Sequence, residues 1–192
     1  MDNPLDLLAK WWSEAKQNSP LQQKSAVCIS TIDANGFPNS RFVDLKDIDE
    51  QGVIFCTSYQ SQKAQDISRN PKVSLTAWWD HIGYQVRLQG DAQPIPVELA
   101  NHYWQQRSHD ARIATLGLQQ SQPAENFEQI TAIVSDAHRK FSESTHSRPE
   151  NWGGYHIVPS KIEFLLFKEN RIHQRRLFES INNHWVATIL QP

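Results

Sequence analysis

The feature that most constrains the fold of this chain is a series of short segments in which apolar and polar residues alternate, separated by tight-turn residues. Between Ala26–Ile32 and Ser40–Lys46 stands Asp33-Ala34-Asn35-Gly36, and an Asn-Gly pair supplies the positive φ that tight hairpins need. Val73–Trp79 and Tyr84–Gly90 flank a second turn in the same way. Strands joined by hairpins are antiparallel. We therefore expect a mainly β fold with helices packed outside, a barrel or a sandwich, and not a doubly wound parallel sheet.

Helical spacing marks the N-terminus and the middle of the chain. Asn3-Pro4 is a helix start signal, and the helix expected over residues 4–17 carries its apolar residues on one face. The other expected helices cover Ser61–Asn70, Val97–Gln106, Asp110–Leu116 and Ala124–Phe141. The other expected strands cover Gly52–Ser58, Tyr155–Val158, Lys161–Lys168, Arg171–Phe178 and Trp185–Leu190, with Asn182-Asn183 at a hairpin tip. We expect a single domain over residues 1–192, in which a C-terminal strand segment, 155–192, completes the site.

Composition narrows the classes of partner. The formal net charge is −2, so the chain lacks the broad basic field that non-specific nucleic-acid binding requires. No apolar stretch approaches the roughly 20 residues of a membrane span, and the acidic N-terminus does not read as a signal peptide. Cys28 and Cys56 lie in apolar runs and are expected as buried thiols. The sequence therefore predicts a cytoplasmic protein that binds neither nucleic acid nor membrane.

The absence of several local motifs argues against the kinds of site that depend on them. The chain contains no GxGxxG, P-loop, HExxH, CxxC or GxSxG motif, and its 8 His residues lack metal-ligand spacing, so we expect no metal. The remaining candidates are anion-binding groups. Arg41 to Lys46 alternates in face along a strand, Ser61-Gln62-Lys63 stands at a helix start, and Arg171, His173 and Arg175 share one face of a predicted strand. Each cluster is also compatible with a solvated surface or a plain helix cap.

At these same positions the sequence resembles the pyridoxamine 5′-phosphate oxidase family of FMN flavoproteins, from about Asn3 to the C-terminus. The pieces that carry the resemblance are RFVDLKDIDEQGVIFCTSYQSQK (41–63), NPKVSLTAWW (70–79), YQVRLQG (84–90), HYWQQR (102–107), QQS (119–121), NWGGY (151–155), KIEF (161–164) and RIHQRR (171–176). No single piece is decisive, but their order and spacing together identify the family.

The resemblance implies an FMN-binding split β-barrel and a homodimer with FMN at the subunit interface. Arg41 would contact the FMN phosphate with Lys63, and the partner subunit would contribute Gln120 and Ser121. The full set of flavin contacts that the resemblance implies is Arg41, Phe42, Val43, Asp44, Leu45, Lys46, Cys56, Thr57, Gln62, Lys63, Gln85, Gln120, Ser121, Leu165 and Arg175. Arginine and lysine suit a phosphate because they form charge-assisted hydrogen bonds.

The same resemblance implies oxidation of pyridoxine or pyridoxamine 5′-phosphate. A hydride passes from substrate to flavin, and O2 then reoxidises the flavin to give H2O2. The substrate phosphate would contact Lys46, Tyr103 and Arg107, while Arg171 and His173 would be the catalytic residues beside the substrate ring.

Several positions depart from the family pattern. Ala111 stands where a serine is usual, Leu165 where a tryptophan is usual, and Gln62 and Ile189 where arginines are usual. Asp44 places an acid in a segment that is normally apolar, and the N-terminal arm that closes over substrate is expected to be missing. Two alternatives therefore stay open. One is a related flavin oxidase acting on another reduced heteroaromatic ring, as in phenazine biosynthesis, and the other is an FMN-binding module with little turnover.

Overall fold

The structure is a computed structural model that describes residues 3–141 and 146–192. The chain forms two compact units. The larger unit comprises Met1–Phe55, Asp66–Gln93 and Tyr155–Pro192, and the smaller comprises Cys56–Gln65 and Pro94–Gly154.

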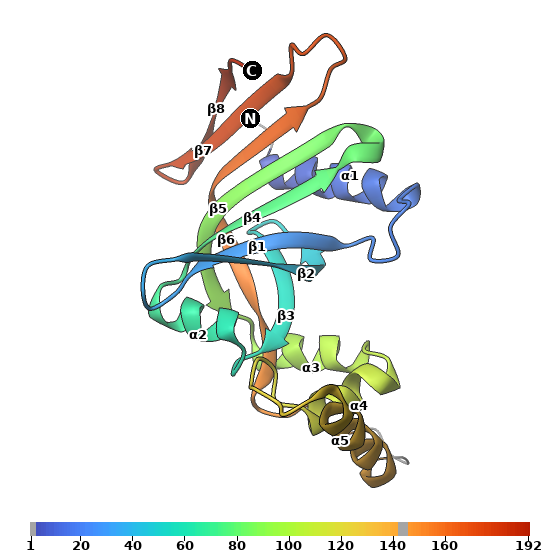
Figure 1. The fold of residues 1–192 in the computed structure, drawn as a ribbon. Coiled ribbons are helices and arrows are strands. Elements are labelled where there is room, and N and C mark those ends of the chain that lie inside the picture. Colours follow the sequence, from blue (N-terminus) through green and yellow to red (C-terminus); the bar gives the residue numbers. More distant parts are fainter. Residues whose placement is uncertain (1–2, 142–145) are drawn as a thin grey trace. The chain divides into compact units, whose positions relative to one another are not determined.

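Antiparallel hairpins build a barrel, one of the two architectures expected from the sequence. The strands are β1 (Ala26–Ile32), β2 (Pro38–Ile48), β3 (Val53–Ser58), β4 (Lys72–Trp79), β5 (Tyr84–Pro94), β6 (Trp152–Leu166), β7 (Gln174–Ile181) and β8 (His184–Leu190). They run in the order β3-β2-β1-β4-β5-β6-β7-β8, and a further pairing of β3 with β6 closes six of them (Figure 1). The β7–β8 hairpin extends the sheet beyond the barrel.

The turns form where the sequence places them. Gly36 takes a φ of +85° in the β1–β2 turn, and Asn182 and Asn183 take positive φ values between β7 and β8. Gly83, with a φ of +68°, ends the short 3-10 helix η1 (Asp80–Ile82) between β4 and β5. These local conformations set the antiparallel pairing of the neighbouring strands.

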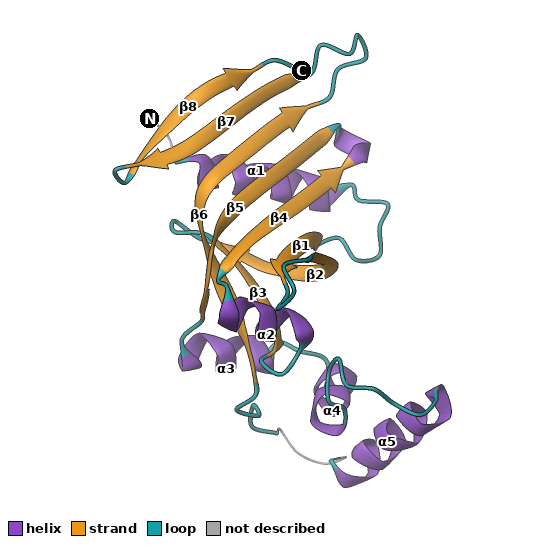
Figure 2. Ribbon diagram, turned by 60° about the vertical axis from the view of Figure 1, so that its left-hand side comes forward, coloured by secondary structure: helices purple, strands orange, loops and turns teal. Residues whose placement is uncertain are grey.

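The N-terminal helix α1 (Pro4–Gln17) has the bounds that the sequence predicts. The Asn3 side chain caps it by accepting from the Leu5 backbone N–H. The helix lies across the sheet (Figure 2), where Trp11 stacks on Tyr84 with ring centroids 4.0 Å apart and meets Phe164 edge-on. These contacts place α1 over β5 and β6.

Two expectations about the C-terminal strands are wrong. Tyr155–Val158 and Lys161–Lys168 belong to one continuous strand, β6. Gly90 on β5 makes this possible, because a Cβ there would lie only 2.2 Å from the Val158 carbonyl oxygen. The next strand, β7, begins at Gln174 and not at Arg171, which takes a φ of +65° in the preceding turn.

The smaller unit holds three helices of its own. They are α3 (Val97–Gln105), α4 (His109–Gly117) and α5 (Phe127–Lys140), while α2 (Gln62–Arg69) starts in this unit and ends in the larger one. The expected helix from Ala124 begins later because the Asn126 side chain caps α5 by accepting from Gln129 N–H. Helices α4 and α5 pack closely at Gly117, where a Cβ would lie 2.8 Å from Ala137 Cβ.

No helix in the described part of the chain is long and apolar enough to span a membrane.

Candidate functional site

The smaller unit contains a group of polar side chains around Thr57, which we call the Thr57 cluster: the buried Thr57, Ser58, Ser61 and Lys63, and the exposed Gln120. Lys63 Nζ donates to Thr57 Oγ1 at 3.2 Å, and Thr57 Oγ1 lies 3.2 Å from Ser61 Oγ. Gln120 Oε1 accepts from Ser58 N at 3.2 Å. A buried ammonium group among hydroxyls and a backbone N–H is a donor set that suits a phosphate.

Gln120 and Ser121 reach this cluster within their own chain. Ser121, which takes a φ of +71°, accepts a hydrogen bond at Oγ from the Gln62 backbone N–H at 3.3 Å. The resemblance implies that the partner subunit contributes this pair to the flavin, and that stays a prediction.

Beside the cluster, a cavity of about 320 Å³ lies wholly within the smaller unit. This volume is at the low end of the range for small-molecule pockets. Its lining residues are Cys56, Thr57, Ser58, Arg107, Ala111, Ala114, Thr115, Leu118, Gln120, Asn151 and Trp152. Among the residues that the structure describes, none of those lining the cavity is acidic. Arg107 therefore gives the cavity a positive character.

Neutral groups hold Arg107 in place. Its Nη2 donates to the Ala111 carbonyl oxygen at 2.9 Å and to Thr115 Oγ1 at 3.0 Å. Its Nε is buried without a hydrogen-bond partner in the described chain. Burial lowers the pKa of Arg107 and Cys56 acts against that shift, but a guanidinium stays charged at neutral pH. A buried cation with an unused donor is suited to bind an anion.

Tyr103, the other residue of the predicted phosphate contact in this unit, is buried on α3, with 6% of its surface exposed. Lys46 belongs to the larger unit and pairs there with Asp44 on the same strand, 2.5 Å away. The acid that departs from the family pattern thus contacts the lysine expected to bind phosphate.

The segment from Arg41 to Lys46 alternates along β2, as predicted. Arg41, Val43 and Leu45 are less exposed than Phe42 and Asp44 on the opposite face. Arg41 Nη1 donates to Thr31 Oγ1 at 2.7 Å, and its Nη2 lies 3.7 Å from the buried Asp66 carboxylate. Burial lowers the pKa of Arg41, and the Asp66 charge acts against that shift. The larger unit therefore holds this arginine with a carboxylate.

Three expected flavin contacts form a row across β5, β6 and β7. Leu165 pairs directly with Arg175. On the other side, Phe167 N donates to Gly83 O, and this register of the antiparallel strands β5 and β6 places Gln85 opposite Leu165. Arg175 is held by Glu163, whose Oε1 accepts from Nε at 2.8 Å. The row presents an amide, an apolar side chain and a paired guanidinium on one sheet face.

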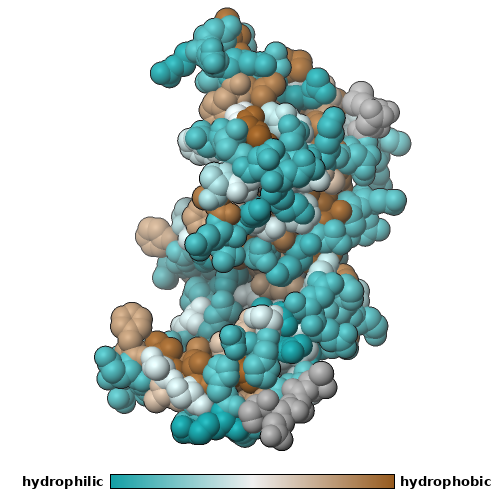
Figure 3. Space-filling model, turned by 90° about the vertical axis from the view of Figure 1, so that its right-hand side faces the viewer, coloured by the Kyte–Doolittle hydropathy of each residue, from teal (hydrophilic) through white to brown (hydrophobic). Residues whose placement is uncertain are grey.

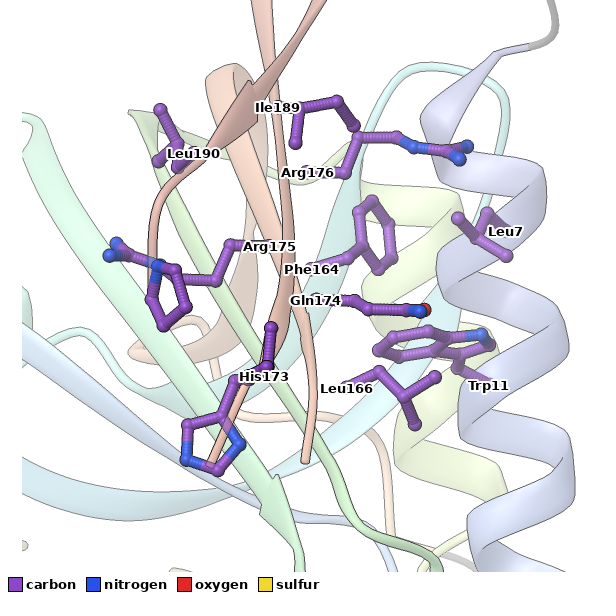
Figure 4. Close-up of a pocket in the computed structure, with 12 residues that line it drawn as sticks. Leu7, Trp11, Phe164, Leu166, His173, Gln174, Arg175, Arg176, Ile189 and Leu190 are labelled. Atoms are coloured by element: carbon purple, nitrogen blue, oxygen red, sulfur yellow. The ribbon is translucent and has the colours of Figure 1, made fainter. Parts of the chain in front are cut away.

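Arg171 and His173 are not part of the strand that contains Arg175, contrary to prediction, because both precede β7. His173 Nδ1 accepts from the Lys168 backbone N–H at 3.1 Å, which places the proton of the neutral ring on Nε2. In Figure 4, His173 and Arg175 point away from α1, whereas Gln174 points toward Trp11. These residues line a cavity of about 670 Å³ in the larger unit, formed by α1 and β6 to β8.

Sequence reasoning missed part of the smaller unit's cavity. Thr115, Asn151 and Trp152 line it, and none of the three is among the predicted site residues. One signal for Thr115 is present in the sequence, since it lies four residues after Ala111 and so shares its helix face. Nothing in the spacing of Asn151 indicates its place. The described residues contain no cluster of His, Cys, Asp or Glu side chains suited to a metal ion.

The closed barrel and a donor cluster suited to an anion are compatible with the class of proteins that bind small phosphorylated ligands. Comparison with known proteins identifies the family. The pyridoxamine 5′-phosphate oxidase profile matches residues 13–141, and the pyridoxine 5′-phosphate oxidase C-terminal dimerisation region matches residues 152–192. The chain therefore belongs to the pyridoxamine 5′-phosphate oxidase family of FMN-binding oxidoreductases, as its motifs indicated.

Relatives that match nearly the whole chain support the same family. The pyridoxine/pyridoxamine 5′-phosphate oxidase of Pelagibacter ubique is 33% identical over 99% of this chain and 92% of its own length. That of Haemophilus influenzae is 35% identical over 99% of this chain and 90% of its own length. Among solved structures, PhzG from Burkholderia lata, in complex with tetrahydrophenazine-1-carboxylic acid, superposes with a TM-score of 0.92. It is 26% identical and covers 100% of this chain and 94% of its own.

The donor set of the smaller unit fits the FMN of this family. The Thr57 cluster combines the Lys63 ammonium with the hydroxyls of Thr57 and Ser61, both largely buried. Such donors match the oxygens of a phosphomonoester, and the segment from Gln62 opens a helix whose dipole favours an anion. The chemistry of this cluster is thus compatible with the phosphate end of that cofactor.

Proposed function

We propose that this protein is an FMN-dependent oxidase of pyridoxine or pyridoxamine 5′-phosphate. The observation that carries the proposal is the cavity of about 320 Å³ with Arg107 at its wall. It offers an uncompensated cation to a substrate phosphate next to the cluster that suits the cofactor phosphate. The names of the full-length relatives support the same substrate.

The residues of the chain bind and orient in this reaction, while FMN supplies the two-electron redox chemistry, with O2 as the final acceptor. Arg107 anchors the substrate phosphate, with Tyr103 and Lys46 as further contacts. Lys63, Thr57 and Arg41 bind the cofactor phosphate. Precise anchoring of both phosphates fixes the distance between the reacting atoms, which is where the protein lowers the barrier.

Arg171 and His173 are proposed to act beside the substrate ring. Because His173 Nδ1 is occupied by the Lys168 N–H, its Nε2–H is the donor available to a substrate oxygen. Arg171 is exposed in a left-handed turn, so its guanidinium is available to a ligand. The flavin contacts Phe42, Val43, Leu45, Cys56, Gln62, Gln85, Leu165 and Arg175 remain proposals of the same kind.

A homodimer with FMN at the subunit interface is part of the proposal. The match to a C-terminal dimerisation region supports it. So does the surface, on which hydrophobic side chains interrupt a hydrophilic background (Figure 3). Phe42 and Trp78, on the two strands that flank β1, are 76% and 60% exposed. Side chains of this size are usually covered in an assembly.

A second candidate is oxidation of a reduced tricyclic carboxylic acid. The similarity to PhzG, solved with tetrahydrophenazine-1-carboxylic acid, favours it. Arg107 would serve a carboxylate as well as a phosphate, and Ala111 leaves the cavity wall with one hydroxyl fewer. The two candidates differ in whether turnover depends on a substrate phosphate.

The test is H2O2 release by FMN-loaded protein in air, with pyridoxamine 5′-phosphate compared with pyridoxamine. We expect saturable turnover that requires the phosphate. Arg107→Ala should raise KM for the phosphorylated substrate about 100-fold, as expected for loss of a charge-assisted contact. Arg112→Ala is the matched control, because Arg112 lies on α4, which begins two residues after Arg107, and is outside the cavity lining.

Equal turnover of both compounds, or an unchanged KM in Arg107→Ala, would contradict phosphate recognition by this cavity. Turnover of a dihydro- or tetrahydrophenazine carboxylic acid, with none for pyridoxamine 5′-phosphate, would establish the second candidate instead.

A further inference from the structure

Position 111 lacks the hydroxyl that the family usually carries there, yet the structure places another hydroxyl in the same cavity. Ala111 and Thr115 lie one helical turn apart on α4, and both line the cavity of the smaller unit. The Thr115 side chain therefore reaches the same wall from the next turn of the helix.

The Thr115 hydroxyl uses both of its hydrogen-bonding capacities locally. It donates to the Ala111 carbonyl oxygen at 2.9 Å and accepts from Arg107 Nη2 at 3.0 Å. Because its proton is committed to the carbonyl, a lone pair faces the guanidinium. Ala111 O accepts from the same Nη2 at 2.9 Å. One nitrogen of Arg107 is thus fixed by a hydroxyl and a carbonyl that are themselves hydrogen-bonded.

We propose that Thr115 is the positioning residue of Arg107 and that it sets the affinity of the cavity for an anionic substrate group, in place of a hydroxyl at position 111. The inference rests on the proposed role of Arg107 as the phosphate contact. An arginine side chain loses considerable rotamer freedom when it binds an anion. A neutral acceptor pre-organises the guanidinium without cancelling its charge, which a carboxylate would do.

The experiment compares Thr115→Val, Thr115→Ser and the double variant Thr115→Val/Ala111→Ser in FMN-loaded protein. We expect Thr115→Val to raise KM for pyridoxamine 5′-phosphate about fivefold, as for the loss of one hydrogen bond. Its kcat should change little, Thr115→Ser should behave as the parent, and the added serine should restore part of the loss. Direct binding of pyridoxal 5′-phosphate, measured by calorimetry, should weaken by the same factor.

Thr131→Val is the matched control. Thr131 makes the same bond to the carbonyl one turn earlier, to Phe127 O at 3.0 Å, but it lies on α5 outside the cavity lining. It should leave KM and pyridoxal 5′-phosphate binding unchanged. FMN affinity, followed by flavin fluorescence, should be the same in all these variants.

The outcomes separate the two proposals. If Arg107→Ala weakens phosphate binding and Thr115→Val does not, the inference about Thr115 is wrong and the proposed function stands. If Thr115→Val weakens FMN binding equally, or affects pyridoxamine as much as its phosphate, the role of Thr115 is structural and the inference is overturned. If Arg107→Ala itself leaves phosphate binding unchanged, this result contradicts the proposed function, which depends on phosphate recognition by Arg107.

Discussion

Arg107 and Arg175 are each held by short hydrogen bonds, but their partners differ in charge. Arg107 in the smaller unit donates to a carbonyl and a hydroxyl. Arg175 in the larger unit donates through Nε and Nη2 to one carboxylate oxygen of Glu163, at 2.8 Å each. Glu163 also lies 3.6 Å from Arg87, so a single buried acid serves two guanidinium groups.

The difference separates an arginine whose charge is compensated within the chain from one whose charge is not. A buried carboxylate neutralises Arg175, whose Nη1 also donates to the Gln191 carbonyl oxygen at 3.1 Å. Arg107 keeps an uncompensated charge and a buried Nε with no partner in the described chain. An unsatisfied buried donor costs about 1–3 kcal/mol. A protein retains such a cost where a binding function uses it.

The largest effect on stability should come from Glu163→Gln. Removing the charge leaves Arg175 and Arg87 without their common acid. Breaking a buried pair costs about 3–5 kcal/mol, but both arginines are partly exposed, so we expect a loss of about 2 kcal/mol. For a chain of this size, the melting temperature should fall by roughly 4–8 °C in calorimetry.

Glu179→Gln provides the control for this change. Glu179 pairs with Lys161 at 2.6 Å, but the Lys161 and Glu179 side chains are 49% and 35% exposed. Exposed pairs contribute little, so its melting temperature should shift by less than about 2 °C. Equal shifts in the two variants would show that Glu163 does not organise the arginines.

A smaller effect of opposite sign is expected from Arg107→Met. Methionine keeps an apolar contact with Trp152, over whose ring Arg107 lies at 5.0 Å, and it removes the buried unsatisfied Nε. We expect substrate-free protein to gain about 1 kcal/mol, or roughly 2–4 °C in melting temperature. A clear decrease would mean that Arg107 stabilises the fold as Arg175 does, and the contrast between them would disappear.

The smallest effect should come from Asp44→Asn, which frees Lys46 from its neighbour. Both side chains are partly exposed, at 49% and 29%, and such pairs are worth about 0.2–1 kcal/mol. Lys46 would then bind a substrate phosphate better, so we expect KM for pyridoxamine 5′-phosphate to fall about two- to threefold at low salt. The gain should vanish at high ionic strength because salt screens exposed charges. No change at low salt would remove Lys46 from the proposed phosphate contacts.

Much of the fold could be predicted because it depends on local rules. Asn3 caps α1, positive φ values at Gly36 and Asn182 turn the hairpins, and period-two alternation assigns the faces of β2. One error arose where a distant contact decided the outcome. Gly90, far from β6 in sequence, lets that strand run on through Pro159. The left-handed φ of Arg171 removes it and His173 from the predicted strand.

In the candidate site, too, the sequence predicted some features and not others. The residue types suited to phosphate were visible in the sequence, and the resemblance supplied their roles. Their partners were not visible: Gln120 meets Ser58 across 62 residues of sequence. Glu163 neutralises Arg175 across a strand pair, and Thr115 fixes Arg107 from the next helix.

The sequence by itself determined most of the secondary structure, the family and which cationic residues are present, because caps, turns, periodicity and motifs act over a few residues. Only the tertiary structure decided that the sheet closes through β3 and β6, and which arginine is neutralised and which keeps its charge. The physical reason is that charge compensation and burial depend on distances between residues far apart in the chain. Local propensities do not fix those distances.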